Sequence, residues 1–203
     1  MQEQEVINIL KEELKFTDQS IDKLKMFEIE LLKVNGNHNF ISKSTESYIW
    51  SRHILDSAQL VKFINFNKGS LSDFGSGAGF PGLVLAIYNQ NFNFHVKLYE
   101  KSPVKRRFLN EMIGKLKIKA SLFSNVFNEK IESDYITSRA FKKLDKIIQV
   151  SREIAKKPHK LLILKGQNAQ EEAIKAFKSY KYSYKLETSM TDEKSKIILA
   201  DIF

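Results

Sequence analysis

The sequence Leu71-Ser-Asp-Phe-Gly-Ser-Gly-Ala-Gly-Phe-Pro-Gly82 constrains the fold more tightly than any other segment of this 203-residue chain. It combines a short apolar segment ending at Asp73, three alternating glycines at positions 75, 77 and 79, and a helix expected to open near Pro81. Alternating glycines let the backbone turn sharply and let a ligand approach without meeting a Cβ atom. The segment therefore predicts a strand, a ligand-binding turn and a helix, in that order.

Beyond this turn, segments of strand character alternate with segments of helix character. Strands are expected at Leu71–Phe74, His95–Tyr99, Ala120–Ser124, Tyr135–Ser138, Lys160–Leu164, Tyr184–Thr188 and Lys196–Asp201. Helices are expected at Gly82–Asn89, Val104–Leu116, Leu144–Lys156 and Ala169–Tyr180. This order predicts an α/β fold with a mostly parallel sheet and helices on both faces. A turn at Thr191-Asp-Glu193 is expected to make the last two strands an antiparallel hairpin, which is more typical of methyltransferase sheets than of dehydrogenase sheets.

The residues before the glycine turn have a helical pattern. Apolar residues between Ile21 and Val34 predict an amphipathic helix that stops at Asn35-Gly-Asn37. A second helix is expected to begin at the cap-like Ser44-Thr-Glu46 and to continue through Val61. Neither helix is apolar all round, so each should lay one face on a neighbour. We therefore expect one structural unit, in which residues 1–66 form a helical N-terminal extension packed on a core of residues 67–203.

The composition excludes several classes of protein. A hydrophobic content of 42% excludes a wholly disordered chain, and no apolar run approaches bilayer length. The N-terminus lacks the basic start and apolar core of a secretion signal. Because the chain has no cysteine, it has neither disulfides nor a thiol nucleophile, and four dispersed histidines make a metal site unexpected. The simplest expectation is a soluble cytoplasmic protein that is a monomer and has no membrane contact.

The formal net charge is +9 and the pI is near 9.5. A charge of this sign favours a polyanionic partner, most plausibly nucleic acid. A general bias towards lysine would produce the same charge, so the charge supports a nucleic-acid partner without establishing one.

An acidic residue at the end of the second expected strand adds to the glycine turn. Glu100 lies 25 residues after Gly75, and in doubly wound sheets an acid at this position binds ribose hydroxyls. A solvated strand end is the alternative for Glu100. The G-x-G-x-G spacing, with Asp73 before it and Phe80 after it, fits a nucleoside cofactor without phosphates, whose amino-acid end the acid and the backbone could hold. It fits a dinucleotide turn less well, and no Walker lysine follows it. S-adenosylmethionine is the first candidate.

Five motifs together make the chain resemble one family. They are Asp73-Phe-Gly-Ser-Gly-Ala-Gly-Phe-Pro-Gly82, Arg52-His-Ile-Leu-Asp-Ser57, Glu100 with Lys105-Arg-Arg-Phe-Leu109, Ser138-Arg-Ala140 and Leu164-Lys-Gly166. On these residues the chain resembles the RsmG family, also called GidB, over nearly its whole length. The resemblance implies a Rossmann-like class I methyltransferase that uses S-adenosylmethionine. It also implies methylation of N7 of guanine 527, in the 530 loop of 16S rRNA, with naked rRNA or the small ribosomal subunit as partner.

The resemblance also implies roles for particular residues. Gly75 and Phe80 would line the cofactor pocket, Val126 and Phe127 would lie beside the adenine, and Arg139 would close the pocket. Gly77 and Glu100 complete the cofactor set that the glycine turn and the second strand predict. The chain departs from the family at Asn125-Val-Phe127, where members usually have Arg-Ala-Glu-like residues.

Guanine N7 carries a lone pair, so its methylation requires positioning and not a general base. Arg139 and Lys165 follow strand ends, where they are expected to position the substrate through O6 or a phosphate. The alternative for Arg139 is a surface ion pair, and the alternative for Lys165 is a solvated strand end. Four cations at a helix start could face RNA, with a solvated helix start as the alternative: Lys101, Lys105, Arg106 and Arg107. His53 and Asp56 share a helical face and could brace the glycine turn, with a capped, structural histidine as the alternative for His53.

Three other functions stay open from the residues alone. A methyltransferase acting on a small molecule or a protein would share the pocket but would not respond to ribonuclease or salt. A binding module, such as a ribosome-assembly factor, would retain the pocket without turnover. A nicotinamide-dependent oxidoreductase would require NAD binding, which the glycine spacing disfavours.

Overall fold

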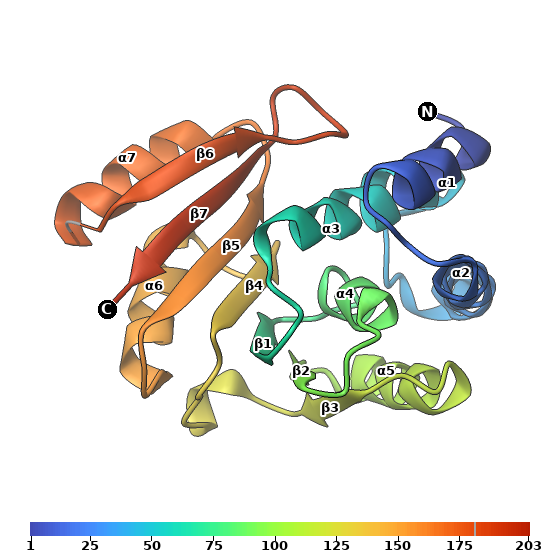
Figure 1. Cartoon of the computed structure of the whole chain (residues 1–203), viewed down its shortest axis with the longest axis horizontal. Helices are drawn as coiled ribbons and strands as arrows, with labels where there is room; N and C mark the ends of the chain where they lie inside the picture. The colour runs from blue at the N-terminus through green and yellow to red at the C-terminus, as the bar shows by residue number, and fades with distance from the viewer. Residues whose placement is uncertain (181) are drawn as a thin grey trace.

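The chain folds into a seven-stranded sheet enclosed by helices (Figure 1). The computed structural model describes residues 1–180 and 182–203. The strands are β1 Gly69–Phe74, β2 Phe94–Tyr99, β3 Ala120–Phe123, β4 Tyr135–Arg139, β5 His159–Lys165, β6 Tyr184–Thr188 and β7 Lys196–Ile202. Their order is β3-β2-β1-β4-β5-β7-β6, with β7 antiparallel to both of its neighbours and the other pairs parallel. All seven predicted strands and the antiparallel hairpin at the end of the chain are confirmed.

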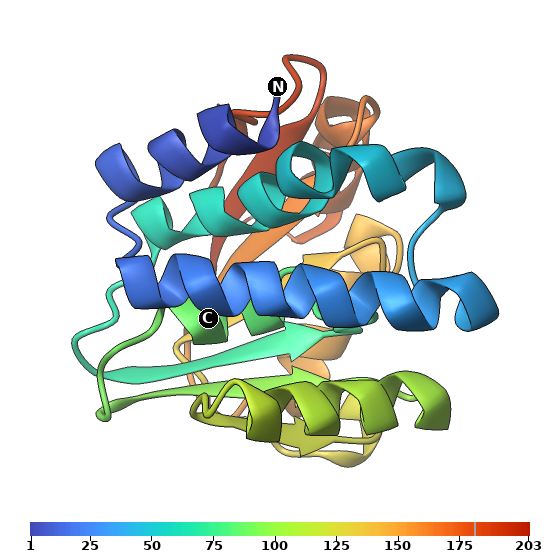
Figure 2. The same cartoon turned by 90° about the vertical axis from the view of Figure 1, so that its right-hand side faces the viewer.

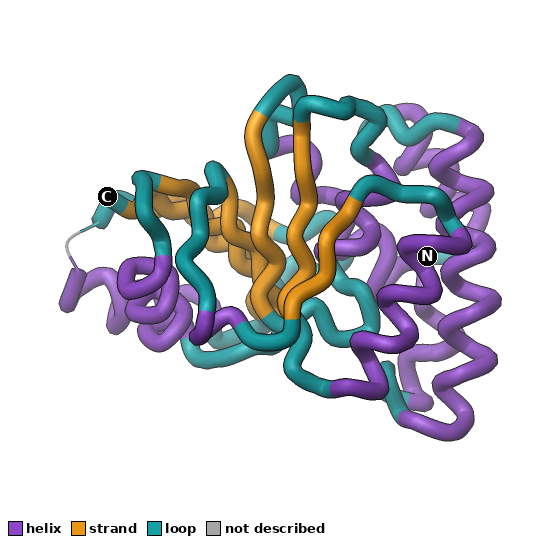
Figure 3. Tube along the Cα trace, turned by 90° about the horizontal axis from the view of Figure 1, so that it is seen from below, coloured by secondary structure: helices purple, strands orange, loops and turns teal. Residues whose placement is uncertain are grey.

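Helices cover both faces of the sheet (Figure 3). One face carries α1 Glu3–Glu12, α2 Asp18–His38, α4 Gly82–Tyr88 and α5 Pro103–Lys115, and the other carries α6 Leu144–Ile154 and α7 Ala169–Tyr180. Strand β5 shows why both faces need a cover, since Leu162 and Leu164 join one apolar cluster while Leu161 and Ile163 join the other. The four helices predicted after the glycine turn are confirmed, with ends that differ by no more than two residues.

The helix predicted to stop at Asn35-Gly-Asn37 runs on to His38. Its end is set by Asn39, which adopts a left-handed conformation with φ 47°. Asn35 does not break the helix because its side chain is fully buried and bound to the following loop. It accepts a hydrogen bond from the Ile41 N–H at 2.8 Å and donates to the Ile41 carbonyl at 3.2 Å. The predicted stop signal is therefore an internal anchor of the helix.

The second N-terminal helix, predicted from Ser44 through Val61, is confirmed as helical backbone from Lys43 to Phe63, but its hydrogen-bonding pattern changes along its length. The segment is divided into a 3-10 helix (Lys43–Tyr48), a π-helix (Trp50–Leu55), a single α turn α3 (Asp56–Ala58) and another 3-10 helix (Gln59–Phe63). Buried Trp50 ties the π-helix to α2 through an indole N–H bond of 2.8 Å to Glu28. Wide π turns are uncommon and recur at functional sites, and this one carries two residues of the site described below.

The N-terminal helices pack on the strand–helix core. Figure 2 looks onto this layer, where α2 crosses the molecule between the 43–63 segment and α5. Side chains from α1, α2 and the 43–63 segment share one apolar cluster with α4 and α5. The division of the chain at residue 66 stays a prediction. Within the described residues, no helix combines the length and the apolar character needed to cross a membrane.

Candidate functional site

The glycine turn connects β1 to α4, and each of its three positions requires glycine for its own structural reason. Gly75, Gly77 and Gly79 all have positive φ angles, of 73°, 57° and 111°, which glycine adopts without steric strain. A Cβ atom on Gly75 would lie 2.5 Å from the Phe141 ring, so this position also requires a close approach. A Cβ atom on Gly77 would meet only the Gly75 carbonyl oxygen, at 3.8 Å. Gly77 is therefore the position of the turn at which a ligand can approach the backbone most freely.

The turn forms one wall of a cavity of about 300 Å³ at the carboxyl ends of β1, β2 and β4. Parallel strands bring their carboxyl ends to the same edge of the sheet, where open α/β sheets bind ligands. All seven residues predicted to bind the cofactor line this cavity: Gly75, Gly77, Phe80, Glu100, Val126, Phe127 and Arg139. Tertiary structure thus brings the predicted set together, while the contacts of each residue with a cofactor stay predictions.

Glu100 lies immediately after β2 and is almost fully buried. One carboxylate oxygen accepts a hydrogen bond from the Gly77 N–H at 2.8 Å, and the other accepts from the Ser102 N–H at 2.7 Å. A carboxylate offers about four lone-pair sites, so each oxygen can accept a further hydrogen bond. Glu100 therefore both fixes the shape of the glycine turn and offers acceptors beside the cavity.

Asp73 does not line this cavity, although the sequence suggested that it helps to hold a ligand. It is completely buried, and its carboxylate accepts hydrogen bonds from the Gly82 N–H at 3.1 Å and the Thr137 hydroxyl at 2.9 Å. Burial raises the pKa of Asp73 to about 6, although these hydrogen bonds favour the charged form. The acid therefore joins β1, β4 and the start of α4 from inside the protein.

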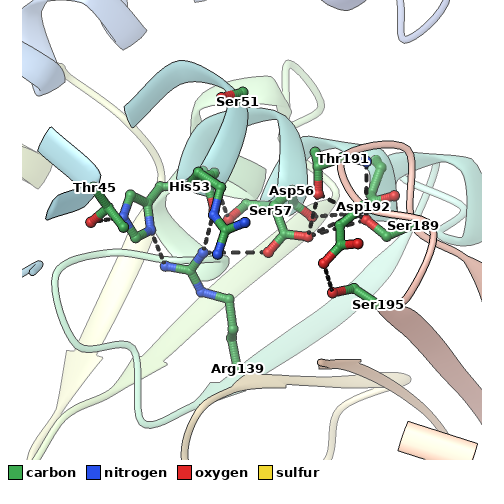
Figure 4. Close-up of polar contacts among 12 residues, drawn as sticks. Thr45, Ser51, His53, Asp56, Ser57, Arg139, Ser189, Thr191, Asp192 and Ser195 are labelled. Atoms are coloured by element: carbon green, nitrogen blue, oxygen red, sulfur yellow. Dashed lines mark hydrogen bonds and ion pairs between the residues drawn. The ribbon is translucent and has the colours of Figure 1, made fainter. Parts of the chain in front are cut away.

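Arg139 extends from the end of β4 under the π-helix (Figure 4). Its guanidinium donates to His53 Nδ1 at 2.9 Å and to the Arg52 carbonyl at 3.2 Å, and it pairs with Asp56 at 3.4 Å. The guanidinium also lies over the ring of Phe80, 4.9 Å from its centroid. The sequence predicted both Arg139 and Phe80 for the cofactor site, and the structure places them in direct contact.

His53 is neutral and has a defined tautomer. Its Nδ1 accepts from Arg139, so its Nε2 carries the hydrogen and donates to Thr45 Oγ1 at 2.9 Å (Figure 4). Burial, assisted by the neighbouring Arg139 and Arg52 charges, lowers the pKa of His53 to about 3. The ring stacks on Phe80 with centroids 5.1 Å apart. His53 braces the glycine turn as predicted, but it does so through Phe80 and Arg139 and not through backbone hydrogen bonds.

Asp56, the first residue of α3, contacts the hairpin at the end of the chain. Its Oδ1 accepts from Gln59 at 3.0 Å and lies 3.4 Å from the hydroxyls of Ser189 and Thr191 (Figure 4). Burial raises the pKa of Asp56, and the Arg139 charge opposes this rise. Asp56 therefore helps to hold Arg139 in place and does not touch the glycine turn.

The segment that departs from the family pattern forms a short 3-10 turn, Val126–Asn128. The Asn125 side chain accepts from the Phe127 N–H at 3.1 Å, so it stabilises the turn in place of an acidic residue. Phe127 is 45% exposed, and its ring centroid lies 6.3 Å from that of Phe141. The segment thus presents an apolar surface to the cavity, which suits a flat base better than a charged group.

Some cavity residues were missed by the sequence reasoning. Phe141 follows Arg139 and Ala140 directly, so extending the strand-end argument by two residues would have found it. Phe40 and Ile41 also line the cavity. They come from the loop after α2 and carry no local signal, because only the packing of α2 on α4 brings them to the glycine turn.

The four cations predicted to face RNA have different surroundings. Lys101 and Lys105 line the cavity mouth. The Arg106 guanidinium donates to the carbonyls of Glu100 and Lys101, at 2.9 and 2.7 Å, and so caps the end of β2. Arg107 is exposed. Arg106 is therefore engaged within the fold, and contact of the four cations with RNA stays a prediction.

Lys165 does not line the 300 Å³ cavity but an adjacent one of about 200 Å³. Its ammonium group donates to the Lys142 carbonyl and to Glu172, both at 2.9 Å. Arg139 and Ala140 line both cavities. Lys165 is therefore one cavity removed from the glycine turn, and its predicted role in substrate positioning is untested.

The larger cavity has the groups that a phosphate-free nucleoside needs. Val126, Phe127 and Phe141 form an apolar wall that could cover a base, Glu100 could accept hydrogen bonds from ribose hydroxyls, and Gly77 leaves space for a close approach. Within the described part of the chain, no three His, Asp or Glu side chains are grouped so that they could hold a metal ion. The residues thus fit the cofactor that the sequence predicted.

Known proteins resemble this chain over most of its length. A family model described as GidB, rRNA small subunit methyltransferase G, matches residues 20–198. Curated relatives named ribosomal RNA small subunit methyltransferase G include one from Orientia tsutsugamushi (strain Ikeda), 33% identical over 96% of this chain and 97% of the relative. Another, from Rickettsia felis, is 37% identical over 88% of this chain and 91% of the relative.

Two solved structures share the fold. A SAM dependent methyltransferase from Aquifex aeolicus has a TM-score of 0.60 at 14% identity, covering 87% of this chain and 98% of that one. M. jannaschii TYW2, solved in complex with AdoMet, has a TM-score of 0.54 at 16% identity, covering 75% of this chain and 76% of that one. At these identities the likeness concerns the fold alone. From the family match and the curated relatives, the chain belongs to the GidB family, rRNA small subunit methyltransferase G, a family of S-adenosylmethionine-dependent methyltransferases.

Proposed function

We propose that this S-adenosylmethionine-dependent methyltransferase transfers a methyl group to N7 of guanine 527, in the 530 loop of 16S rRNA. Family membership supports the reaction class and the ribosomal RNA substrate. The observation that supports N7 as the acceptor concerns proton removal in the cavity beside the glycine turn. Its described residues provide no free general base.

The groups of this cavity that could act as a base are engaged or protonated. His53 has a pKa of about 3, but both of its ring nitrogens already have hydrogen-bond partners. Burial raises the pKa of Tyr99 to about 12, so its phenol keeps its proton. Glu100 holds two backbone N–H groups, and in this proposal its remaining lone pairs accept from the cofactor ribose. A hydroxyl or a ring N–H would have to lose a proton to a base before or during transfer. The N7 lone pair of guanine needs no such step, so this cavity is suited to it.

The bound cofactor supplies a methyl group activated on a sulfonium. The protein contributes positioning and exclusion of water, which is catalysis by proximity. In this proposal Glu100 accepts hydrogen bonds from the ribose, Val126 and Phe127 cover the adenine, and the Gly75–Gly77 turn lets the cofactor approach. Arg139, held by His53 and Asp56 at the boundary of both cavities, contacts the acceptor base.

Cations around the cavity complete the substrate site. Lys101 and Lys105 line the cavity and Arg107 is exposed on the same helix start, and in this proposal all three neutralise phosphates. Lys165 lines the second cavity and helps to position the base there. We propose that Arg106 contributes only indirectly, by shaping the end of β2. The reaction takes place in the cytoplasm, where ribosomal RNA is found, and a monomer is the active form.

The test is to map the methyl group. The protein is incubated with methyl-labelled S-adenosylmethionine and either naked 16S rRNA or small subunits from a strain that lacks this activity. Borohydride reduction followed by aniline treatment releases 7-methylguanine and cuts RNA at the abasic site, so a break at guanine 527 together with release of the labelled base is the expected result. The Gly77→Val variant serves as the cofactor-site control. Label at another atom would refute the N7 assignment, and no transfer to any ribosomal RNA would refute the substrate.

A further inference from the structure

The second cavity shares a wall with the first one and is lined differently. It measures about 200 Å³ and is lined by Asp56, Arg139, Ala140, Leu164, Lys165, Gly166 and Ser195. Ligand cavities for drug-sized molecules begin at about 300 Å³, so this one suits a smaller, flat group such as a single base. Ala140 and Leu164 offer apolar contact, while Asp56 and Arg139 offer an acceptor beside a donor.

The two charged groups lie close together and are held in place. Arg139 Nη1 and Asp56 Oδ2 are 3.4 Å apart, and their side chains are only 19% and 17% exposed. In the described part of the chain, Oδ2 has this one long contact, whereas Oδ1 is bonded to Gln59 at 3.0 Å. A contact of 3.4 Å is longer than an ordinary hydrogen bond. Oδ2 can therefore accept a shorter bond from a ligand.

Guanine presents a matching pair of groups on neighbouring atoms. Its O6 accepts hydrogen bonds, and the adjacent N1–H and 2-amino groups donate them, while N7 lies on the other side of O6. Adenine has the reverse order, with a donor at position 6 and an acceptor at N1. A donor next to a carboxylate acceptor therefore distinguishes the two purines.

We propose that the second cavity receives the target guanine flipped out of its RNA loop, and that the Arg139–Asp56 pair selects it over other purines. Arg139 donates to O6, and Asp56 Oδ2 accepts from N1–H. Because Arg139 and Ala140 line both cavities, this orientation directs the N7 edge to the shared wall and the cofactor side. Single-stranded RNA bases are commonly read through these edges after unstacking. The inference rests on the proposed function and assigns its base-binding residues.

The test compares three bases at the target position. Reconstituted small subunits carry guanine, inosine or 2-aminopurine at position 527, and kcat/KM is measured at saturating S-adenosylmethionine. All three bases retain N7. Inosine also retains O6 and N1–H, whereas 2-aminopurine has neither. Since a bidentate pairing discriminates by about 10-fold to 100-fold, we expect inosine to be methylated nearly as well as guanine and 2-aminopurine to be rejected by that factor.

The Asp56→Asn variant carries the decisive readout. Its amide can donate to the N1 lone pair of 2-aminopurine, so we expect the preference for guanine over 2-aminopurine to fall about 10-fold or more. A purely structural role of Asp56 would lower all three rates equally and leave the preference unchanged, which would overturn the proposal. Asp201→Asn is the matched control, since Asp201 is half-exposed at the far end of β7.

A second variant keeps the proposal testable if Asp56→Asn does not fold. A Cβ atom on Gly166 would meet no atom within 4 Å, so Gly166→Leu adds bulk beside the cavity without a clash at Cβ. We expect it to lower guanine methylation at least about 10-fold with unchanged cofactor affinity, a loss equivalent to one base contact. Unchanged methylation would refute the cavity as the base site. If the wild-type protein labels no guanine N7 at all, the proposed function fails first, and this inference fails with it.

Discussion

Replacing Asp73 by asparagine should remove a pH-dependent part of the stability of this protein. Asp73 is fully buried between β1, β4 and α4, and burial raises its pKa from 3.8 to about 6. The folded state therefore binds this proton more tightly than the unfolded state. The resulting stabilisation is fully present below about pH 4 and is lost as the pH rises through about 6. A shift of about two units corresponds to about 3 kcal/mol.

The asparagine variant keeps the shape and the hydrogen bonds of the site. Its amide oxygen can accept from the Gly82 N–H, and its NH₂ group can donate to the Thr137 hydroxyl, which can also act as an acceptor. We therefore expect the stability of Asp73→Asn to lack the pH dependence that the Asp73 carboxyl causes. The stability of the variant relative to wild type should rise by about 2–3 kcal/mol between pH 4 and pH 7.

Urea unfolding at a series of pH values measures this difference. The fluorescence of Trp50, the single tryptophan, reports unfolding because its ring is buried against α2. Comparing each variant with wild type at the same pH cancels the contributions of other titrating groups. Asp201→Asn, which alters a half-exposed carboxylate, is the control. Parallel wild-type and Asp73→Asn curves across this pH range would refute the buried, proton-binding role assigned to Asp73.

Four further variants test the site and its surroundings. Gly77→Val should weaken S-adenosylmethionine binding at least about tenfold in calorimetry, since valine is strained at φ 57° and extends into the open side of the turn; unchanged affinity would misplace the site. Glu100→Gln places a side-chain NH₂ group against one of the two backbone N–H donors that Glu100 holds. The free energy of unfolding should therefore fall by about 1–3 kcal/mol, and the affinity for the cofactor should fall with it. Lys105→Ala should lower the salt dependence of RNA binding by about one phosphate contact without changing the melting temperature. Arg106→Ala should lower the melting temperature because it leaves two backbone carbonyls without their donor. If Lys105→Ala lowered the melting temperature and Arg106→Ala only weakened RNA binding, the roles assigned to Lys105 and Arg106 would be reversed.

Local sequence patterns were sufficient for the strands and for the helices of the core. Strand β5 is an apolar run and β2 alternates apolar with polar residues, while α6 has a clear apolar face, so local signals and tertiary packing agree in these elements. The N-terminal segment was harder to predict. Asn35 has the local preference of a helix stop, but a buried side chain bonded to Ile41 overrides that preference. The π-helix around Trp50 has no period that a sequence pattern reveals.

The candidate site could be predicted only in part, for a related reason. Gly75, Gly77 and Glu100 are recognisable because they follow strands within one strand–turn–helix unit, where short-range geometry fixes their positions. Asp73 belongs to the same unit, yet its side chain turns inward to Gly82 and Thr137 instead of towards a ligand. The direction of a side chain at a strand end depends on which strand lies beside it, and no local pattern reports that neighbour.

The sequence by itself determined the α/β class, the glycine turn and the residues at the strand ends, because each depends on backbone preferences within a few neighbouring residues. Only the tertiary structure decided which of these residues work together. Arg139 meets His53 and Asp56 across more than 80 positions of the chain. That contact exists because β4 lies beside β1 and the N-terminal segment packs across the end of the sheet. Long-range packing, which is not encoded in any single segment, thus creates the Arg139–Asp56 pair and the boundary between the two cavities.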